Sequence, residues 1–204
     1  LNTGGGHKSS ANVLKNIFLE KYPDAEVIVE DGFDPKNIFG KIAFEKLYHF
    51  SMNFASGLYS FIYRISGRWF QTLTIKFLNL RTNRYLKKLI RKHHPTDIVC
   101  FHFALGHAVI NAVRRENPNI RASMVVTDPF TAHGTWFYER KLNYYVFSDR
   151  VKQLAITKCK IPEKNVTVVP FLINQKFRKV ATKEDIRIIR EKHNLPVDKK
   201  IVFL

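Results

Sequence analysis

The sequence is poor in cysteine and has no long apolar run. Its two cysteines, Cys100 and Cys159, are too few for a disulfide framework, which favours a reducing compartment. A helix that crosses a bilayer needs about 20 consecutive apolar residues, and no such stretch occurs. The sequence also lacks a basic segment followed by an apolar core, the pattern of a secretory signal. We therefore expect a soluble or peripheral protein.

Acidic residues are missing from one long segment. None lies between Lys46 and Thr96, in a chain whose net charge is +17. Aromatic residues are interleaved with the cations of this segment, as in interfacial helices that place rings at headgroup depth and cations on phosphates. The alternative is a pair of core-packing helices with a solvated basic face. We expect contact with anionic membrane lipids, made by Tyr59, Tyr63, Arg64, Arg68, Trp69, Phe70 and Lys76.

Short apolar runs alternate with helical patterns along the chain. Nearly continuous apolar strands are typical of parallel sheets covered on both faces, and the alternation predicts an α/β fold with a doubly wound parallel sheet. The expected strands are Ala25–Val29, Asp97–His102, Ala122–Thr127, Tyr144–Ser148, Val166–Val169 and Ile201–Leu204. The expected helices are Ser9–Tyr22, one or two across Lys36–Ser66, Arg81–His93, Leu105–Glu116, Asp149–Thr157 and Lys183–His193.

Both ends of the sequence predict a larger protein. The first glycine-rich turn should follow a buried strand, but only Leu1 and Asn2 precede it. Lys199–Leu204 has the pattern of a first strand with nothing after it. We expect residues 1–180 to form one domain, and residues 181–204 to be a linker helix and the first strand of a second domain. Alternatively, Ile201–Leu204 joins the first sheet as an edge.

A histidine closes the glycine-rich turn at the start of the chain. Glycines at positions 4 to 6 let the backbone approach a ligand closely. The helix expected behind them, from Ser9 and Ser10, directs free N–H groups at an anion. His7 is a titratable group in that turn, as a general base should be. The alternative is a plain strand-to-helix turn in which His7 faces water.

Further polar residues follow the predicted strands, where open α/β sheets bind their ligands. Asp128 either caps its own turn or orients the imidazole of His7. His133 and Trp136 either line an acceptor pocket or pack as ordinary core. The residues concerned are His102, with His107 one helical turn later, Thr127, Asp128, His133, Trp136 and Ser148.

Several common site signatures are missing. The histidines lack the paired spacing of a metal site. Neither the phosphate loop Gly-x-x-x-x-Gly-Lys-[Ser/Thr] nor the nucleophile turn Gly-x-Ser-x-Gly occurs. These absences disfavour ATP hydrolysis and serine esterase chemistry, and we expect no metal and no cofactor.

Three stretches together resemble the monogalactosyldiacylglycerol synthase and processive diacylglycerol glucosyltransferase family. They are Thr3-Gly4-Gly5-Gly6-His7-Lys8-Ser9-Ser10-Ala11, then Val126-Thr127-Asp128 with His133 and Trp136, then Tyr144–Pro170. The resemblance implies the N-terminal half of a GT-B enzyme with two Rossmann-like domains. In such an enzyme the N-terminal domain binds the lipid acceptor and the membrane, and the C-terminal domain binds a UDP-sugar.

The resemblance implies an inverting, metal-independent transfer of a hexose from a UDP-sugar to a lipid such as diacylglycerol, at the cytoplasmic face of a membrane. His7 matches the family's proposed base, and Asp128 would orient or assist it. We expect the donor to face Gly4, Gly5, Gly6, Ser9 and Ser10, and the acceptor to meet His102, His133 and Trp136. The alternatives are a basic nucleic-acid-binding module, suggested by the cations of Arg81–Lys92, and a lipid-binding domain without catalysis.

Overall fold

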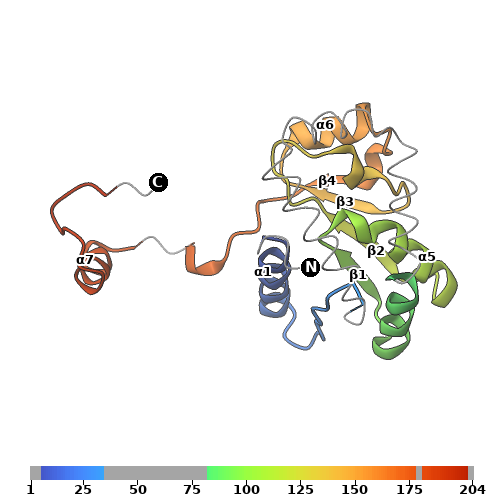
Figure 1. Cartoon of the computed structure of the whole chain (residues 1–204), viewed down its shortest axis with the longest axis horizontal. Helices are drawn as coiled ribbons and strands as arrows, with labels where there is room; N and C mark the ends of the chain where they lie inside the picture. Colours follow the sequence, from blue (N-terminus) through green and yellow to red (C-terminus); the bar gives the residue numbers. More distant parts are fainter. Residues whose placement is uncertain (1–5, 35–81, 178–180, 202–204) are drawn as a thin grey trace, which may run out of the picture. The chain divides into compact units, whose positions relative to one another are not determined.

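The computed structural model describes residues 6–34, 82–177 and 181–201 (Figure 1). It divides into two units, Leu1–Phe171 and Leu172–Leu204. This division precedes the boundary expected at residue 180, and the assignment of the two parts to domains of a larger enzyme stays a prediction. The helices expected across Lys36–Ser66 lie outside the described residues.

The first unit contains a parallel four-stranded sheet, which confirms the predicted Rossmann-like α/β class (Figure 1). Its strands lie side by side in chain order. The register is supported at one end, where Asp97 lies opposite Arg121 and the two side chains form an ion pair with Nε and Oδ1 2.7 Å apart. The strands are β1 Asp97–Cys100, β2 Arg121–Val125, β3 Asn143–Val146 and β4 Val166–Val168.

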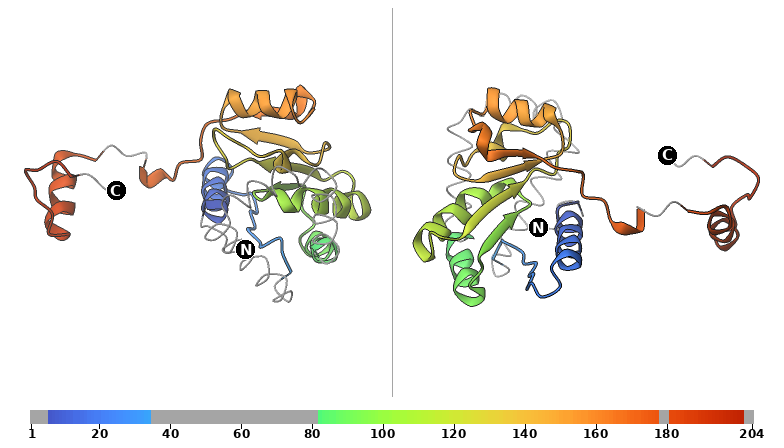
Figure 2. Two further views of the ribbon diagram at one scale, coloured as in Figure 1. Left: turned by 45° about the horizontal axis from the view of Figure 1, so that its top comes forward. Right: turned by 180° about the vertical axis from the view of Figure 1, so that it is seen from behind.

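Helices connect the strands as βαβ units. Helix α5, Gly106–Glu116, joins β1 to β2 and packs on β2, and α6, Asp149–Thr157, joins β3 to β4 and packs on both (Figure 2). Helix α1, Gly6–Lys21, and a helical segment at 82–93 also belong to the first unit. Helix α7, Lys183–Lys192, lies in the second unit. Short 3-10 turns are η1 Phe103–Leu105, η2 Gly134–Phe137, η3 Glu163–Asn165 and η4 Gln175–Phe177.

The core lies between the sheet and α5 and α6. Met124, Leu142, Tyr144 and Val146 are fully buried. The hydroxyl of Tyr144 donates to the carbonyl of Glu139 at 2.6 Å, which satisfies the buried phenol. Burial and the nearby charge of Glu139 raise the pKa of this phenol, so it stays protonated.

One predicted strand is wrong. Residues 25–29 have no regular structure, and Ile28 and Val29 are exposed. They are rich in β-branched apolar residues, as strands often are, but none of the described strands pairs with them, and strand propensity depends on such packing. The strand expected at Ile201–Leu204 is not formed at Ile201, and its remaining residues lie outside the described range.

Helix α1 begins earlier than expected. The pattern predicted its start at Ser9, but the helix starts at Gly6. His7 therefore lies in the first helical turn and not in the turn that precedes it. The first four N–H groups of a helix have no partner within the helix, so this turn carries free donors next to His7.

Candidate active site

His7 contacts residues that follow two different strands. Its Nδ1 lies 3.2 Å from the hydroxyl oxygen of Thr127, which follows β2. Its ring lies edge-on to the ring of His102, which follows β1, with centroids 5.0 Å apart. The ring of Trp136 is 6.0 Å away. The carboxyl ends of parallel strands meet at one edge of a sheet, and the structure brings the predicted residues together there.

His102 is a buried, neutral imidazole. It caps the N-terminus of η1, and its Nδ1 accepts a hydrogen bond from the backbone N–H of Ala104 at 3.2 Å. A nitrogen that accepts cannot carry the proton, so the proton of neutral His102 is on Nε2. Burial, followed by the neighbouring charge of His7, lowers the pKa of His102 to about 3.

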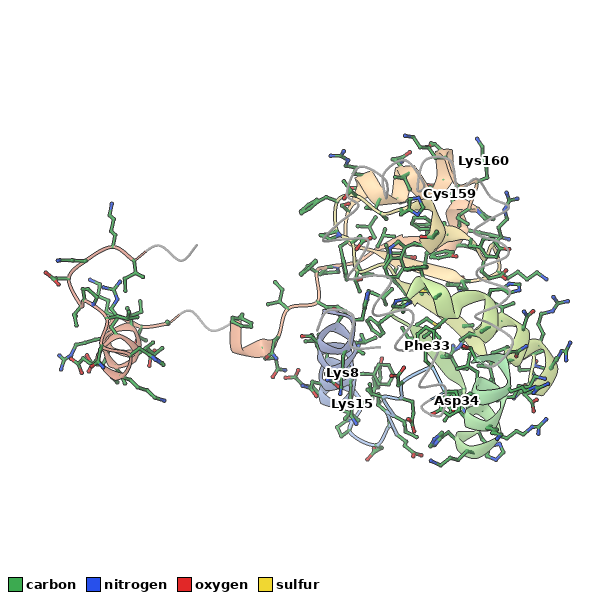
Figure 3. The ribbon with its side chains drawn as sticks, in the orientation of Figure 1. Lys8, Lys15, Phe33, Asp34, Cys159 and Lys160 are labelled. Carbon is green, nitrogen blue, oxygen red and sulfur yellow. The ribbon has the colours of Figure 1, made fainter. Side chains whose placement is uncertain are left out.

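Aromatic rings enclose His102. The ring of Phe103 stacks on it with centroids 4.7 Å apart. Phe33, whose side chain is labelled in Figure 3, packs edge-on at 5.7 Å. His102 is buried, with an exposed fraction of 8%, and its ring packs against that of His7. A role in acceptor binding stays a prediction.

Asp128 is bound to Trp136. The indole Nε1 donates to Oδ2 of Asp128 at 2.8 Å. One alternative from the sequence was a pairing of Asp128 with the imidazole of His7, but among the described residues the side-chain hydrogen bond of His7 is with Thr127. Asp128 still influences its neighbours through its negative charge, which acts to raise the pKa of His7 and of His133.

The ring of His7 is held towards its neutral form. Burial is the largest effect and lowers the pKa of His7 below the usual value of a histidine. The charge of Asp128 and a hydrogen bond with the backbone of Phe101 oppose this shift. A general base must be unprotonated before it acts, and the environment of His7 favours that state.

Trp136 and His133 belong to one short segment. Trp136 is only 4% exposed, and its buried indole donates a hydrogen bond to Asp128. His133 caps η2, where its Nδ1 accepts a hydrogen bond from the N–H of Thr135. Burial lowers the pKa of His133 as well. The structure places the ring of Trp136 beside that of His7, with His133 on the same short segment, and their expected contact with an acceptor stays a prediction.

The donor-facing loop is described only in part. Gly6 is exposed, and a Cβ built at this position meets no heavy atom within 4 Å. Ser9 and Ser10 lie in the first turns of α1, close to Lys8, which is labelled in Figure 3. Gly4 and Gly5 lie outside the described residues, as do the expected membrane contacts Tyr59, Tyr63, Arg64, Arg68, Trp69, Phe70 and Lys76.

Two other polar residues near the strand ends have structural partners. His107 lies at the start of α5, with Nε2 3.0 Å from the amide of Asn111 in the same helix. Its Nδ1 lies 3.2 Å from the carboxylate of Glu139, and this contact links α5 to the chain after η2. Ser148 caps α6 and donates to the carbonyl of Pro129 at 2.6 Å. The Ser148 bond holds the Asp128 turn against the end of β3.

Thr127 was expected near the strand ends, but the sequence assigned it no role. A hydroxyl placed directly after a buried strand, one position before Asp128, was the available signal. Its position is well fixed, because the N–H of the preceding Val126 donates to the carbonyl of Tyr145 at 2.9 Å.

Two features are absent from the residues that the structure describes. No three His, Cys, Asp or Glu side chains converge there as metal ligands would. None of the described helices is long and apolar enough to cross a membrane.

Comparison with known proteins gives consistent matches. The family of monogalactosyldiacylglycerol (MGDG) synthase matches residues 7–169. The chloroplastic monogalactosyldiacylglycerol synthase of Spinacia oleracea is 25% identical over 189 residues, which cover 91% of this chain and 36% of the relative. The processive diacylglycerol beta-glucosyltransferase of Bacillus licheniformis is 26% identical over 203 residues, covering 100% of this chain and 51% of the relative.

The matched region contains the assembled site. It begins at His7 and includes Thr127, Asp128 and Trp136. The chain spans about half the length of the bacterial relative and about a third of the plant one. The family match covers most of the chain, the sheet has the expected α/β order, and the histidine of the glycine-rich turn lies at the carboxyl edge of that sheet. The chain belongs to the monogalactosyldiacylglycerol synthase family.

Proposed function

We propose that this chain forms the acceptor-binding part of a glycosyltransferase that moves a hexose from a UDP-sugar to a lipid hydroxyl, such as that of diacylglycerol. The observation that carries the proposal is the environment of His7, a half-buried imidazole beside Thr127 and within the field of Asp128. The relatives' names, a synthase and a glucosyltransferase of diacylglycerol lipids, support the same reaction class.

In the proposed reaction His7 takes the proton of the acceptor hydroxyl. The acceptor oxygen then uses its electron pair to form a bond to the anomeric carbon of the sugar. The bond between that carbon and the UDP oxygen breaks, and its electron pair leaves with UDP. Attack from the face opposite UDP inverts the anomeric centre. No metal or cofactor takes part in this scheme.

The first turn of α1 would face the leaving diphosphate. Free N–H groups at a helix start favour negative charge, and charge develops on UDP as the bond breaks. The open space at Gly6 leaves room for a ligand to approach the backbone. Gly4, Gly5, Ser9 and Ser10 complete the proposed donor-facing loop.

The reaction is tested by replacing the base in the protein at its full natural length. His7→Ala should lower transfer by at least about 100-fold, because general-base catalysis contributes roughly that factor or more. Transfer of radiolabelled sugar to diacylglycerol vesicles measures it. The matched control is His193→Ala, at the exposed end of α7, which should transfer at the unaltered rate. Near-normal turnover by His7→Ala would remove His7 from the mechanism.

We also propose that the protein works as a peripheral protein at the cytoplasmic face of a membrane and binds anionic lipid there. Support comes from the net charge of +17 and from the acid-free segment between Lys46 and Thr96. A nucleic-acid-binding module would share the charge but leaves the His7 site without a role. A lipid-binding module without catalysis is contradicted if His7→Ala abolishes transfer while the unaltered protein is active.

A further inference from the structure

We propose that Thr127 is the positioning residue for His7, holding the imidazole in its Nδ1–H tautomer so that Nε2 accepts the proton of the acceptor. The proposal rests on the proposed function, since it assigns the nitrogen that performs the proton transfer. It gives the orienting role to a neutral hydroxyl and not to the neighbouring carboxylate of Asp128.

The geometry of the contact is the first argument. The hydroxyl oxygen of Thr127 is 3.2 Å from Nδ1 of His7. A neutral histidine carries its proton on one ring nitrogen, and the hydrogen bond made by that nitrogen decides which one. The hydroxyl of Thr127 can donate or accept in this contact, and the backbone of Phe101 also forms a hydrogen bond with the ring. In the proposed tautomer the threonine oxygen accepts from Nδ1–H, which leaves the lone pair on Nε2, at the other edge of the ring.

The rigidity of Thr127 is the second argument. Threonine is branched at Cβ, which restricts its χ1 angle. The preceding residue, Val126, is fully buried, and its N–H donates to Tyr145 on the neighbouring strand. The hydroxyl oxygen is therefore held by the sheet, whereas His7 comes from a separate helix.

The engagement of Asp128 is the third argument. Its Oδ2 accepts from the indole of Trp136 at 2.8 Å, and Trp136 is buried. The carboxylate is therefore directed to the indole and acts on His7 through its charge. Two adjacent residues therefore act on His7 in different ways. Thr127 contacts the imidazole ring, and Asp128 acts on it through its negative charge.

The proton balance is simple. The acceptor proton moves to Nε2, and the oxygen keeps the electron pair that forms the new bond to the sugar. The Nδ1 proton stays on the threonine side throughout. The imidazolium then releases the Nε2 proton to water after UDP has left.

The test combines nuclear magnetic resonance with kinetics. Long-range ¹H–¹⁵N correlation spectra of the His7 ring should show Nδ1 protonated in the unaltered protein. Thr127→Val is nearly isosteric and should raise the Nε2–H population. Thr127→Ser keeps the hydroxyl and should restore the original pattern. Thr157→Val, whose hydroxyl donates to Gln153 on the exposed end of α6, is the matched control and should change nothing.

The kinetic expectation follows the same logic. Loss of one hydrogen bond to the base should lower kcat of Thr127→Val about tenfold, with KM for the lipid within about twofold. A wild-type His7 protonated on Nε2, or a ring unaffected by Thr127→Val, would overturn the proposal. The spectrum reports the tautomer of His7 independently of activity. Normal sugar transfer by His7→Ala would reject the proposed reaction but not the role of Thr127 in fixing the tautomer.

Discussion

At the scale of single residues, the neutral state of His102 links the stability of the protein to pH. Its side chain is buried, its Nδ1 is occupied by the N–H of Ala104, and its pKa is lowered to about 3. The unfolded chain would bind a proton near the ordinary histidine value. Between these two values the unfolded state binds more protons, so stability falls as the pH falls.

The expected loss is large enough to measure. Between pH 7 and pH 5 the free energy of unfolding should fall by about 2 kcal/mol from His102 alone. His7 and His133, whose pKa values are also lowered, act in the same direction. In His102→Asn, which keeps an N-cap acceptor for Ala104, the fall should be smaller. Urea titrations at the two pH values measure it.

The control for this experiment is another histidine of the same unit. His94 is exposed and has a positive φ of 44°, a conformation that asparagine adopts readily. His94→Asn should keep the pH dependence of the unaltered protein. Identical slopes for His102→Asn and the unaltered protein would contradict the assignment to His102.

At the scale of the elements, α5 is fitted closely to the sheet at its first residue. A Cβ on Gly106 would lie 3.0 Å from Cδ1 of Leu142 and 3.1 Å from Cε of Met124, and both of these side chains are fully buried. Gly106→Val should therefore lower the free energy of unfolding by about 1–3 kcal/mol, the usual cost of overpacking. Thermal and urea unfolding followed by circular dichroism measure this loss.

A second glycine provides the comparison. A Cβ on Gly134 would meet the Sγ of Cys159 at 3.8 Å, an ordinary contact. Gly134→Val should therefore cost less than half as much as Gly106→Val. Equal losses would mean that the close approach of α5 to the sheet does not set the cost.

At the scale of the whole molecule, the excess of positive charge predicts a salt-dependent attraction to anionic membranes. Liposomes that contain an anionic lipid should pellet the protein at low ionic strength, and neutral liposomes should pellet much less of it. The difference should shrink as salt is added, because exposed charges are screened beyond about 10 Å at 0.1 M salt. Equal, weak pelleting on both kinds of liposome would reject the membrane proposal.

The sequence predicts the structure correctly where composition and position in the chain are sufficient to identify a strand or the residue that follows it. The strand at 97–100 and its neighbours were predictable because nearly continuous apolar runs mark a sheet covered on both faces. The contacts of His7 with His102 and Thr127 were predictable from the rule that parallel strands end at a common edge. Residues 25–29 carry the same apolar signal without becoming a strand, because pairing depends on neighbours that the local sequence does not specify.

The partners within the site were less predictable. Thr127 and Asp128 are adjacent, and both carry an oxygen that could bind an imidazole. Which one does so depends on the direction of each side chain and on the competing indole of Trp136, which is eight positions further along. Charge favours the aspartate as the partner of His7, but the threonine makes the contact.

The modest packing of α1 has a consequence for thermal inactivation. This helix carries His7, the proposed base, yet within its described length Val13 is the buried side chain, whereas α5 buries six residues. Segments with little buried apolar surface open at a lower free energy than the whole fold. Amide protons of α1 should therefore exchange with deuterium faster than those of α5, and gentle heating should abolish the proposed transfer activity while the sheet is still intact.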